Sequence, residues 1–111
     1  MIEVASRMPD QYVPANGQAK FAVPEGTFTH SNPGERLNLA AQQADGRPLP
    51  TWLQFNSQSG TFTGTPPAGF VGEIVIKVIA RDSNGNEVET VFRVNIGSKP
   101  APDGRTSLMK Q

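Results

Sequence analysis

The sequence predicts an all-β protein, an antiparallel β-sandwich of about seven strands, and three observations support this. Apolar residues recur at every second position in several short segments. Turn-forming residues separate these segments at roughly the 8–12-residue spacing that is typical of sandwiches. The 111 residues include 11 Gly and 10 Pro, and no segment of adequate length has a helical period. Because Gly and Pro disfavour helix interiors, short strands joined by turns remain the best interpretation.

The two strongest strand predictions lie near the C-terminus. Residues 87–96 alternate with a period of two, which is typical of a half-buried strand. Residues 73–82 carry apolar side chains on both faces, which favours a central strand that is partly covered on its second side. The pair Asn84-Gly85 lies between the two segments. Since both residues tolerate positive φ, this pair predicts a tight turn and therefore a long β-hairpin.

The other expected strands are shorter. They lie at residues 12–13, 18–23, 36–42, 53–55 and 61–63. Pro14 directly follows the first of them, and an edge strand tolerates proline because its outward N–H needs no partner. The pair Pro66-Pro67 ends the last of them and redirects the chain towards the other sheet.

The domain boundaries follow from where alternation starts and stops. The length leaves room for one domain. We expect residues 1–9 to form an N-terminal extension or linker, residues 10–97 the sandwich, and residues 98–111 a linker or tail.

Composition excludes several classes of function. Ten basic residues balance ten acidic ones, so no net field attracts nucleic acid or an anionic membrane. No apolar run approaches the roughly 20 residues that a membrane-spanning helix needs. The chain has no Cys, which excludes a disulfide scaffold and a thiolate metal site. The first ten residues lack the apolar region of a secretion signal, so the chain is either cytoplasmic, if Met1 is the native start, or a piece of a larger protein.

Several linked motifs carry a family resemblance. They read LPTWLQFN at residues 49–56, SGTFTGTP at 59–66, a glycine at 72, and ARDSNG at 80–85, with FAVPEGTF at 21–28 upstream. In this order they resemble the dystroglycan-type cadherin-like domain, also called the putative immunoglobulin-like domain of bacterial surface proteins. The resemblance covers about residues 11–96. It implies an immunoglobulin-like or cadherin-like sandwich, repeated in large extracellular proteins such as bacterial adhesins, and frequently bound Ca²⁺.

The resemblance also implies where Ca²⁺ would bind. Its ligands here would include Glu25, Asp45 and Asp82. Three positions where the family carries Asp hold a neutral residue in this sequence: His30, Asn32 and Asn56. Each loss removes one charge from a shell that needs six to eight oxygen ligands. The alternative for Asp82 is structural, because an Asp before a turn accepts hydrogen bonds from the turn backbone.

The residues do not predict an enzyme. The single histidine, His30, stands beside Ser31, but adjacent residues rarely form a nucleophile–base pair and no orienting acid is evident. Asp45 and Asp82 could in principle form an acid/base pair as in glycosidases, but acidic residues in turns are more often structural.

The function we expect is therefore that of a non-catalytic structural and adhesive repeat module in a larger bacterial cell-surface or secreted protein. Its partners would be neighbouring domains of the same chain and a protein or glycan ligand, and the isolated domain would be monomeric. The alternative is a carbohydrate- or peptide-binding accessory module that uses loops at one end of the sandwich. An aromatic platform of Trp52, Tyr12 and Phe70 would serve such a module, whereas Trp52 buried in the core would argue against it.

Overall fold

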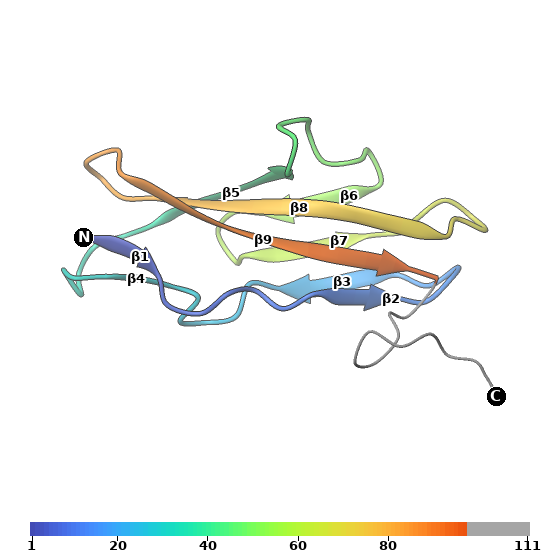
Figure 1. Cartoon of the computed structure of the whole chain (residues 1–111), viewed down its shortest axis with the longest axis horizontal. Coiled ribbons are helices and arrows are strands. Elements are labelled where there is room, and N and C mark those ends of the chain that lie inside the picture. The colour runs from blue at the N-terminus through green and yellow to red at the C-terminus, as the bar shows by residue number, and fades with distance from the viewer. Residues whose placement is uncertain (98–111) are drawn as a thin grey trace.

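The computed structural model describes residues 1–97, and the expected tail at 98–111 lies outside the described residues (Figure 1). Nine strands make up the described part of the chain. They are β1 (Ile2–Val4), β2 (Gln11–Val13), β3 (Ala19–Ala22), β4 (Phe28–His30), β5 (Asn38–Gln43), β6 (Leu53–Asn56), β7 (Thr61–Gly64), β8 (Gly72–Arg81) and β9 (Glu87–Ile96). The described residues include no helix long and apolar enough to cross a membrane.

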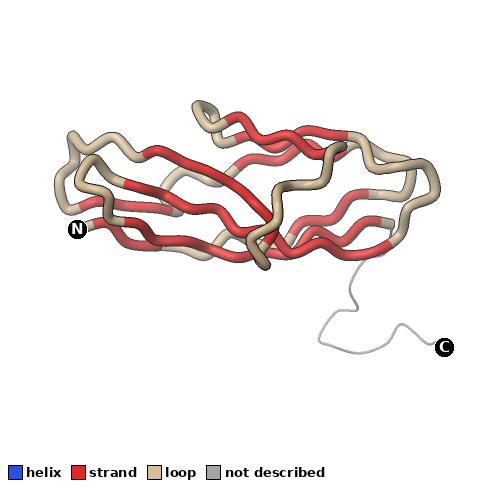
Figure 2. The backbone as a smooth tube through the Cα atoms, turned by 90° about the horizontal axis from the view of Figure 1, so that it is seen from above, coloured by secondary structure: helices blue, strands red, loops and turns tan. Residues whose placement is uncertain are grey.

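The strands form a sandwich of two main sheets, as predicted. One sheet has the order β2-β9-β8-β5 and the other the order β3-β7-β6, while β1 and β4 make a separate two-stranded ribbon. The layers are seen from a second side in Figure 2, where loops gather mainly at the two ends of the molecule. All pairs are antiparallel except that of β2 with β9, which is parallel. A parallel pair is possible here because a long connection, and not a hairpin, separates β2 from β9.

The long hairpin of β8 and β9 is present, as the sequence predicts. Arg81 pairs with Glu87 at the turn and Gly72 with Ile96 at the far end. The polar faces of these strands carry alternating charges that form cross-strand ion pairs. The pairs are Arg81–Glu87, Lys77–Glu89 and Arg93–Glu73. The basic residues are thus matched by acidic ones, which gives this surface mixed charge and no basic patch.

Aromatic rings join the two sheets. The Phe62 side chain of β7 is fully buried, and its ring centroid lies 4.9 Å from that of Phe21, 4.6 Å from that of Phe55 and 5.8 Å from that of Phe92. Phe92 belongs to the four-stranded sheet, whereas the other three rings belong to the three-stranded sheet. Such contacts contribute beyond their buried area. Phe62 is therefore the centre of the core.

The N-terminus differs from the expectation. Residues 1–9 were expected to be an extension, but Ile2 lies in β1 and is buried, and Met8 belongs to the main core. The domain therefore begins at about residue 2 rather than 10. A three-residue strand is too short to show alternation, and its partner, β4, was likewise not predicted as a strand. Both elements depend on pairing between segments about 26 residues apart, which local patterns do not report.

Candidate functional site

The densest group of polar contacts lies at one end of the sandwich. Here the β8–β9 turn meets the end of β4 and the segment that follows it, and β1 begins nearby (Figure 1). Three side chains carry the contacts between these segments: His30, Glu35 and Asp82. We call this group the end cluster.

Asp82 is the centre of the end cluster. Its side chain is 1% exposed. The Oδ1 atom accepts hydrogen bonds from the backbone N–H groups of Asn84 (3.0 Å) and Asn86 (2.9 Å). The Oδ2 atom accepts from Asn86 Nδ2 (3.1 Å) and lies 3.1 Å from His30 Nε2. A carboxylate offers about four acceptor positions, so protein donors occupy all of them. Asp82 thus accepts hydrogen bonds from the turn backbone, as the structural alternative for this residue predicts.

The histidine tautomer follows from its two neighbours. His30 Nδ1 accepts a hydrogen bond from the backbone N–H of Asn32 (2.9 Å) and therefore bears no proton. Nε2 faces a carboxylate, which can only accept, so Nε2 carries the proton and donates it to Asp82. His30, the last residue of β4, therefore links this strand directly to the β8–β9 turn.

Hydrogen bonds also lower the pKa values of the two acidic groups in the end cluster. Burial acts to raise the pKa of Asp82, but hydrogen bonds from Asn86, His30 and Asn84 outweigh it and lower this pKa to about 2. Glu35 accepts a 2.7 Å hydrogen bond from the Ser83 backbone N–H, and its hydrogen bonds with Ser83 lower its pKa as well. Both groups thus favour the charged form in the folded state.

The Asp82 shift predicts a specific loss of stability in acid. The folded pKa of about 2 lies below the usual value of 3.8, so the stabilisation is present above pH 3.8 and is lost as pH falls through 2. In Asp82→Asn this component is absent, so the free energies of unfolding of the two proteins should converge from pH 4 to pH 2. Urea unfolding across this range is the measurement. A difference in free energy of unfolding that stays constant with pH would contradict the prediction. The control is Asp45→Asn: because the Asp45 side chain is 54% exposed, this substitution should change the free energy of unfolding little at any pH in the range.

The structure separates the three residues that the sequence assigned to Ca²⁺. Asp82 lies at the turn between β8 and β9, whereas Asp45 follows β5 at the opposite end of the sheet, where it pairs with Arg47 at 2.7 Å. Glu25 is exposed in the turn between β3 and β4. Among residues 1–97, no group of three or more acidic or histidine side chains is placed to hold a metal ion. The three residues therefore do not make one site, and Ca²⁺ binding by the chain stays a prediction. Because Asp45 and Asp82 lie at opposite ends of the sheet, they cannot act together as an acid/base pair either.

The aromatic residues proposed as a sugar platform are not equivalent. Trp52 and Phe70 are partly buried and pack against the core, whereas Tyr12 on β2 is 40% exposed. These contacts support a core position for Trp52. Blue-shifted Trp52 fluorescence that resists quenching is the expected result, and a red-shifted, quencher-accessible signal would favour the platform.

The comparison with family models decides the relationship. The model for the family described as "Putative Ig domain" matches residues 2–97. The chain belongs to this family. The match begins at β1, in agreement with the structural boundary rather than with the expected one. No curated protein matches the sequence.

Solved structures add similarity of fold to this Ig domain. The solution structure of the PKD domain from KIAA 1837 protein has a TM-score of 0.52 and 14% identity over 89% of this chain and 88% of that one. A putative α-galactosidase from Bacteroides fragilis has a TM-score of 0.61 and 16% identity, covering 86% of this chain and 17% of that one. The third structure is a nucleoside hydrolase-related hypothetical protein from Saccharophagus degradans, described as associated with carbohydrate metabolism. It has a TM-score of 0.56 and 15% identity, covering 82% of this chain and 22% of that one. The Ig domain thus spans only a small part of the two larger proteins, and domains of this type are typically non-catalytic modules.

Sequence reasoning missed the bond that organises the end cluster. His30 and Asp82 are 52 positions apart, and only the folded chain brings them together. The available signal was the histidine at a position where the resemblance implies Asp. In the folded chain this histidine forms a direct hydrogen bond to Asp82.

Proposed function

We propose that this Ig domain is a structural and adhesive spacer module of a larger bacterial cell-surface or secreted protein. The observation that carries the proposal is the position of its first and last described strands. β1 lies near the β8–β9 turn, because Met1 C=O accepts from Ser31 N–H and the neighbouring His30 contacts Asp82. Gly97 lies at the other end, where its N–H donates to Val13 C=O.

The ten-residue strands of the hairpin set the distance between these ends. At about 3.3 Å per residue, β8 and β9 span roughly 33 Å. The principal extents are 52 × 30 × 22 Å, so the domain is elongated along this direction. Domains joined before residue 2 and after residue 97 would therefore attach at opposite ends, and each module would add its length to a chain of modules (Figure 1).

Distance measurements on a tandem protein test the spacing role. The chain has no Cys, so Glu3→Cys in the first copy and Val71→Cys in the second give two unique labelling positions. Both side chains are exposed, and they lie at opposite ends of the fold. We expect electron–electron resonance to give a distance clearly longer than within one copy carrying both labels. A distance equal to or shorter than that within one copy would overturn the spacer role.

The same tandem protein tests Ca²⁺. If junctions between copies use the metal, millimolar Ca²⁺ will narrow the distance distribution and raise the melting temperature. An unchanged distribution and melting temperature would overturn the Ca²⁺ prediction alone and leave the spacing result intact.

A second candidate is a glycan-binding accessory module, favoured by the fold shared with parts of the two larger proteins above. Its test is a glycan array probed with the chain and with Tyr12→Ala, which alters the more exposed of the aromatic residues considered above. Binding that the variant loses would support this role. Equal binding would move the site away from Tyr12, and no binding at millimolar glycan would eliminate the role.

A further inference from the structure

The outer edge of β5 offers unpaired backbone groups. β5 pairs with β8 on one side only and forms one edge of the four-stranded sheet. Ala44 N–H donates to Val75 C=O on β8, whereas Gln43 N–H points away from β8 and donates to Arg47 C=O. Since alternate residues of a strand direct their backbone groups to opposite sides, Leu39 and Ala41 share the outward direction of Gln43. Within residues 1–97, no backbone group pairs with the outward donors and acceptors of Leu39 and Ala41.

The edge also lacks the features that usually protect such strands. Asn38–Gln43 contains neither a proline nor a charged residue. Edge strands of natural proteins are commonly blocked by charges, proline, bulges or a covering segment. Here the turn after β5 satisfies only Gln43, through Arg47 C=O and Gly46 N–H. Two consecutive outward-facing positions, Leu39 and Ala41, thus remain available.

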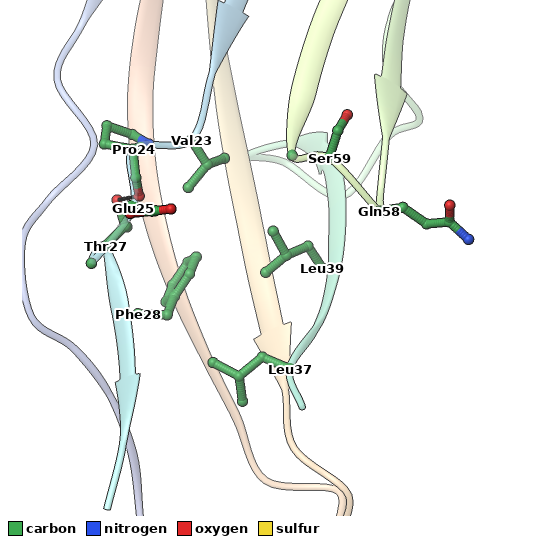
Figure 3. Close-up of a pocket in the computed structure, with 11 residues that line it drawn as sticks. Val23, Pro24, Glu25, Thr27, Phe28, Leu37, Leu39, Gln58 and Ser59 are labelled. Atoms are coloured by element: carbon green, nitrogen blue, oxygen red, sulfur yellow. Dashed lines mark hydrogen bonds between the residues drawn. The ribbon is translucent and has the colours of Figure 1, made fainter. Parts of the chain in front are cut away.

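A groove lies beside these groups. Figure 3 shows Leu37 and Leu39 facing Val23 and Phe28 across it, with Gln58 and Ser59 at its rim. Its volume is about 210 Å³. A protein cavity of about 150 Å³ accommodates benzene, so one apolar side chain fits here. In an antiparallel or parallel pair, neighbouring strands direct side chains to the same faces. The residues of an added strand that lie beside Leu39 and Ala41 would therefore face the groove.

We propose that the β5 edge binds an extended peptide segment of a partner protein as an added strand, with one apolar side chain in this groove. Main-chain hydrogen bonds to Leu39 and Ala41 would supply affinity, and the groove would supply specificity. A second copy of the chain fits less well. Because the outward groups of Gln43 are already paired, an antiparallel β5–β5 contact through Leu39 and Ala41 would set Ala41 of one copy beside Leu39 of the other, and an alanine methyl group is too small to fill the groove. The site lies on an edge of the fold and does not depend on the spacer role.

Binding of short synthetic peptides to the 111-residue chain tests the proposal. The probes are three capped eight-residue peptides of alternating threonine and valine with terminal lysines, in which one central valine is kept or replaced by leucine or phenylalanine. We expect at least one peptide to shift the amide resonances of Leu39 and Ala41 and to slow their hydrogen exchange at least tenfold. The control is the same peptide N-methylated at the amides that would face β5, which should bind at least tenfold more weakly. Equal binding by the methylated peptide, shifts elsewhere, or no shift at millimolar peptide would overturn the proposal.

A protein variant gives an independent readout. Ala41→Pro removes an outward N–H without removing a hydrogen bond to β8, and edge strands tolerate such a proline. It should reduce peptide affinity at least tenfold, while Ala41→Ser, which keeps the N–H, should bind like the unchanged chain. Unchanged affinity in a folded Ala41→Pro protein would overturn the proposal. If that variant does not fold, the methylated peptide still decides, because it leaves the protein unaltered. Resonances of β5 that shift with protein concentration alone would indicate self-association and would also overturn it.

Discussion

Phe62→Ala is expected to lower the free energy of unfolding by about 3–5 kcal/mol. Phe62 is fully buried and its ring contacts Phe21, Phe55 and Phe92, so truncation leaves a cavity that spans both sheets. A domain of this size is commonly stable by only about 5–15 kcal/mol. The expected loss is thus a large share of the free energy of unfolding of the whole domain.

Chemical denaturation at neutral pH measures this loss. Val91→Ala is the control, because Val91 is 39% exposed on the outer face of β9 and its truncation should change the free energy of unfolding by less than about 0.5 kcal/mol. A Phe62→Ala loss of the same size as the control would contradict the central position of this ring.

Gly64→Ala is expected to cost about 3 kcal/mol or to prevent folding, because overpacking against rigid backbone has no inexpensive relaxation. An added Cβ atom would overlap the Trp52 carbonyl oxygen and lie 3.0 Å from the Leu53 Cα atom. Both neighbours are backbone atoms of the segment leading into β6, which pairs with β7 at this point. The substitution therefore has to separate two paired strands.

The matched control is Gly34→Ala. The nearest atom to an added Cβ there is the Asn32 side-chain oxygen at 3.7 Å, which is an ordinary contact. Thermal unfolding of the two variants should place Gly34→Ala close to the unchanged protein and Gly64→Ala far below it. Similar melting temperatures for both variants would show that the contact between β6 and β7 leaves room for a side chain at position 64.

The strands with many residues were predictable because alternation repeats along them. β9 has the predicted bounds, β8 is displaced by one residue, and the Asn84-Gly85 turn joins them. The expected covering of the second face of β8 is also present, since Val75 and Ile79 there are half-buried. These features depend on neighbouring residues, so local physics is sufficient to specify them.

The end cluster was only partly predictable. Asp82 was recognised as a residue of interest, and its role in the turn was one of the two alternatives. Its contact with His30 and the contact of Glu35 with Ser83 join segments about 50 residues apart. No periodic pattern encodes such contacts, because they depend on how β4 and the segment after it pack against the β8–β9 turn.

By itself the sequence determined the class of fold, the long hairpin and the absence of net charge, since these follow from alternation, turn chemistry and composition. Tertiary structure alone decided that β1 and Met8 belong to the domain, that β2 pairs in parallel with β9, and that the β5 edge stays open beside a groove. It also separated Asp45 from Asp82, which lie at opposite ends of the sheet formed by β5 and β8. The physical reason is the same in each case: local preference selects a strand or a turn, whereas burial and pairing between distant segments select its partner.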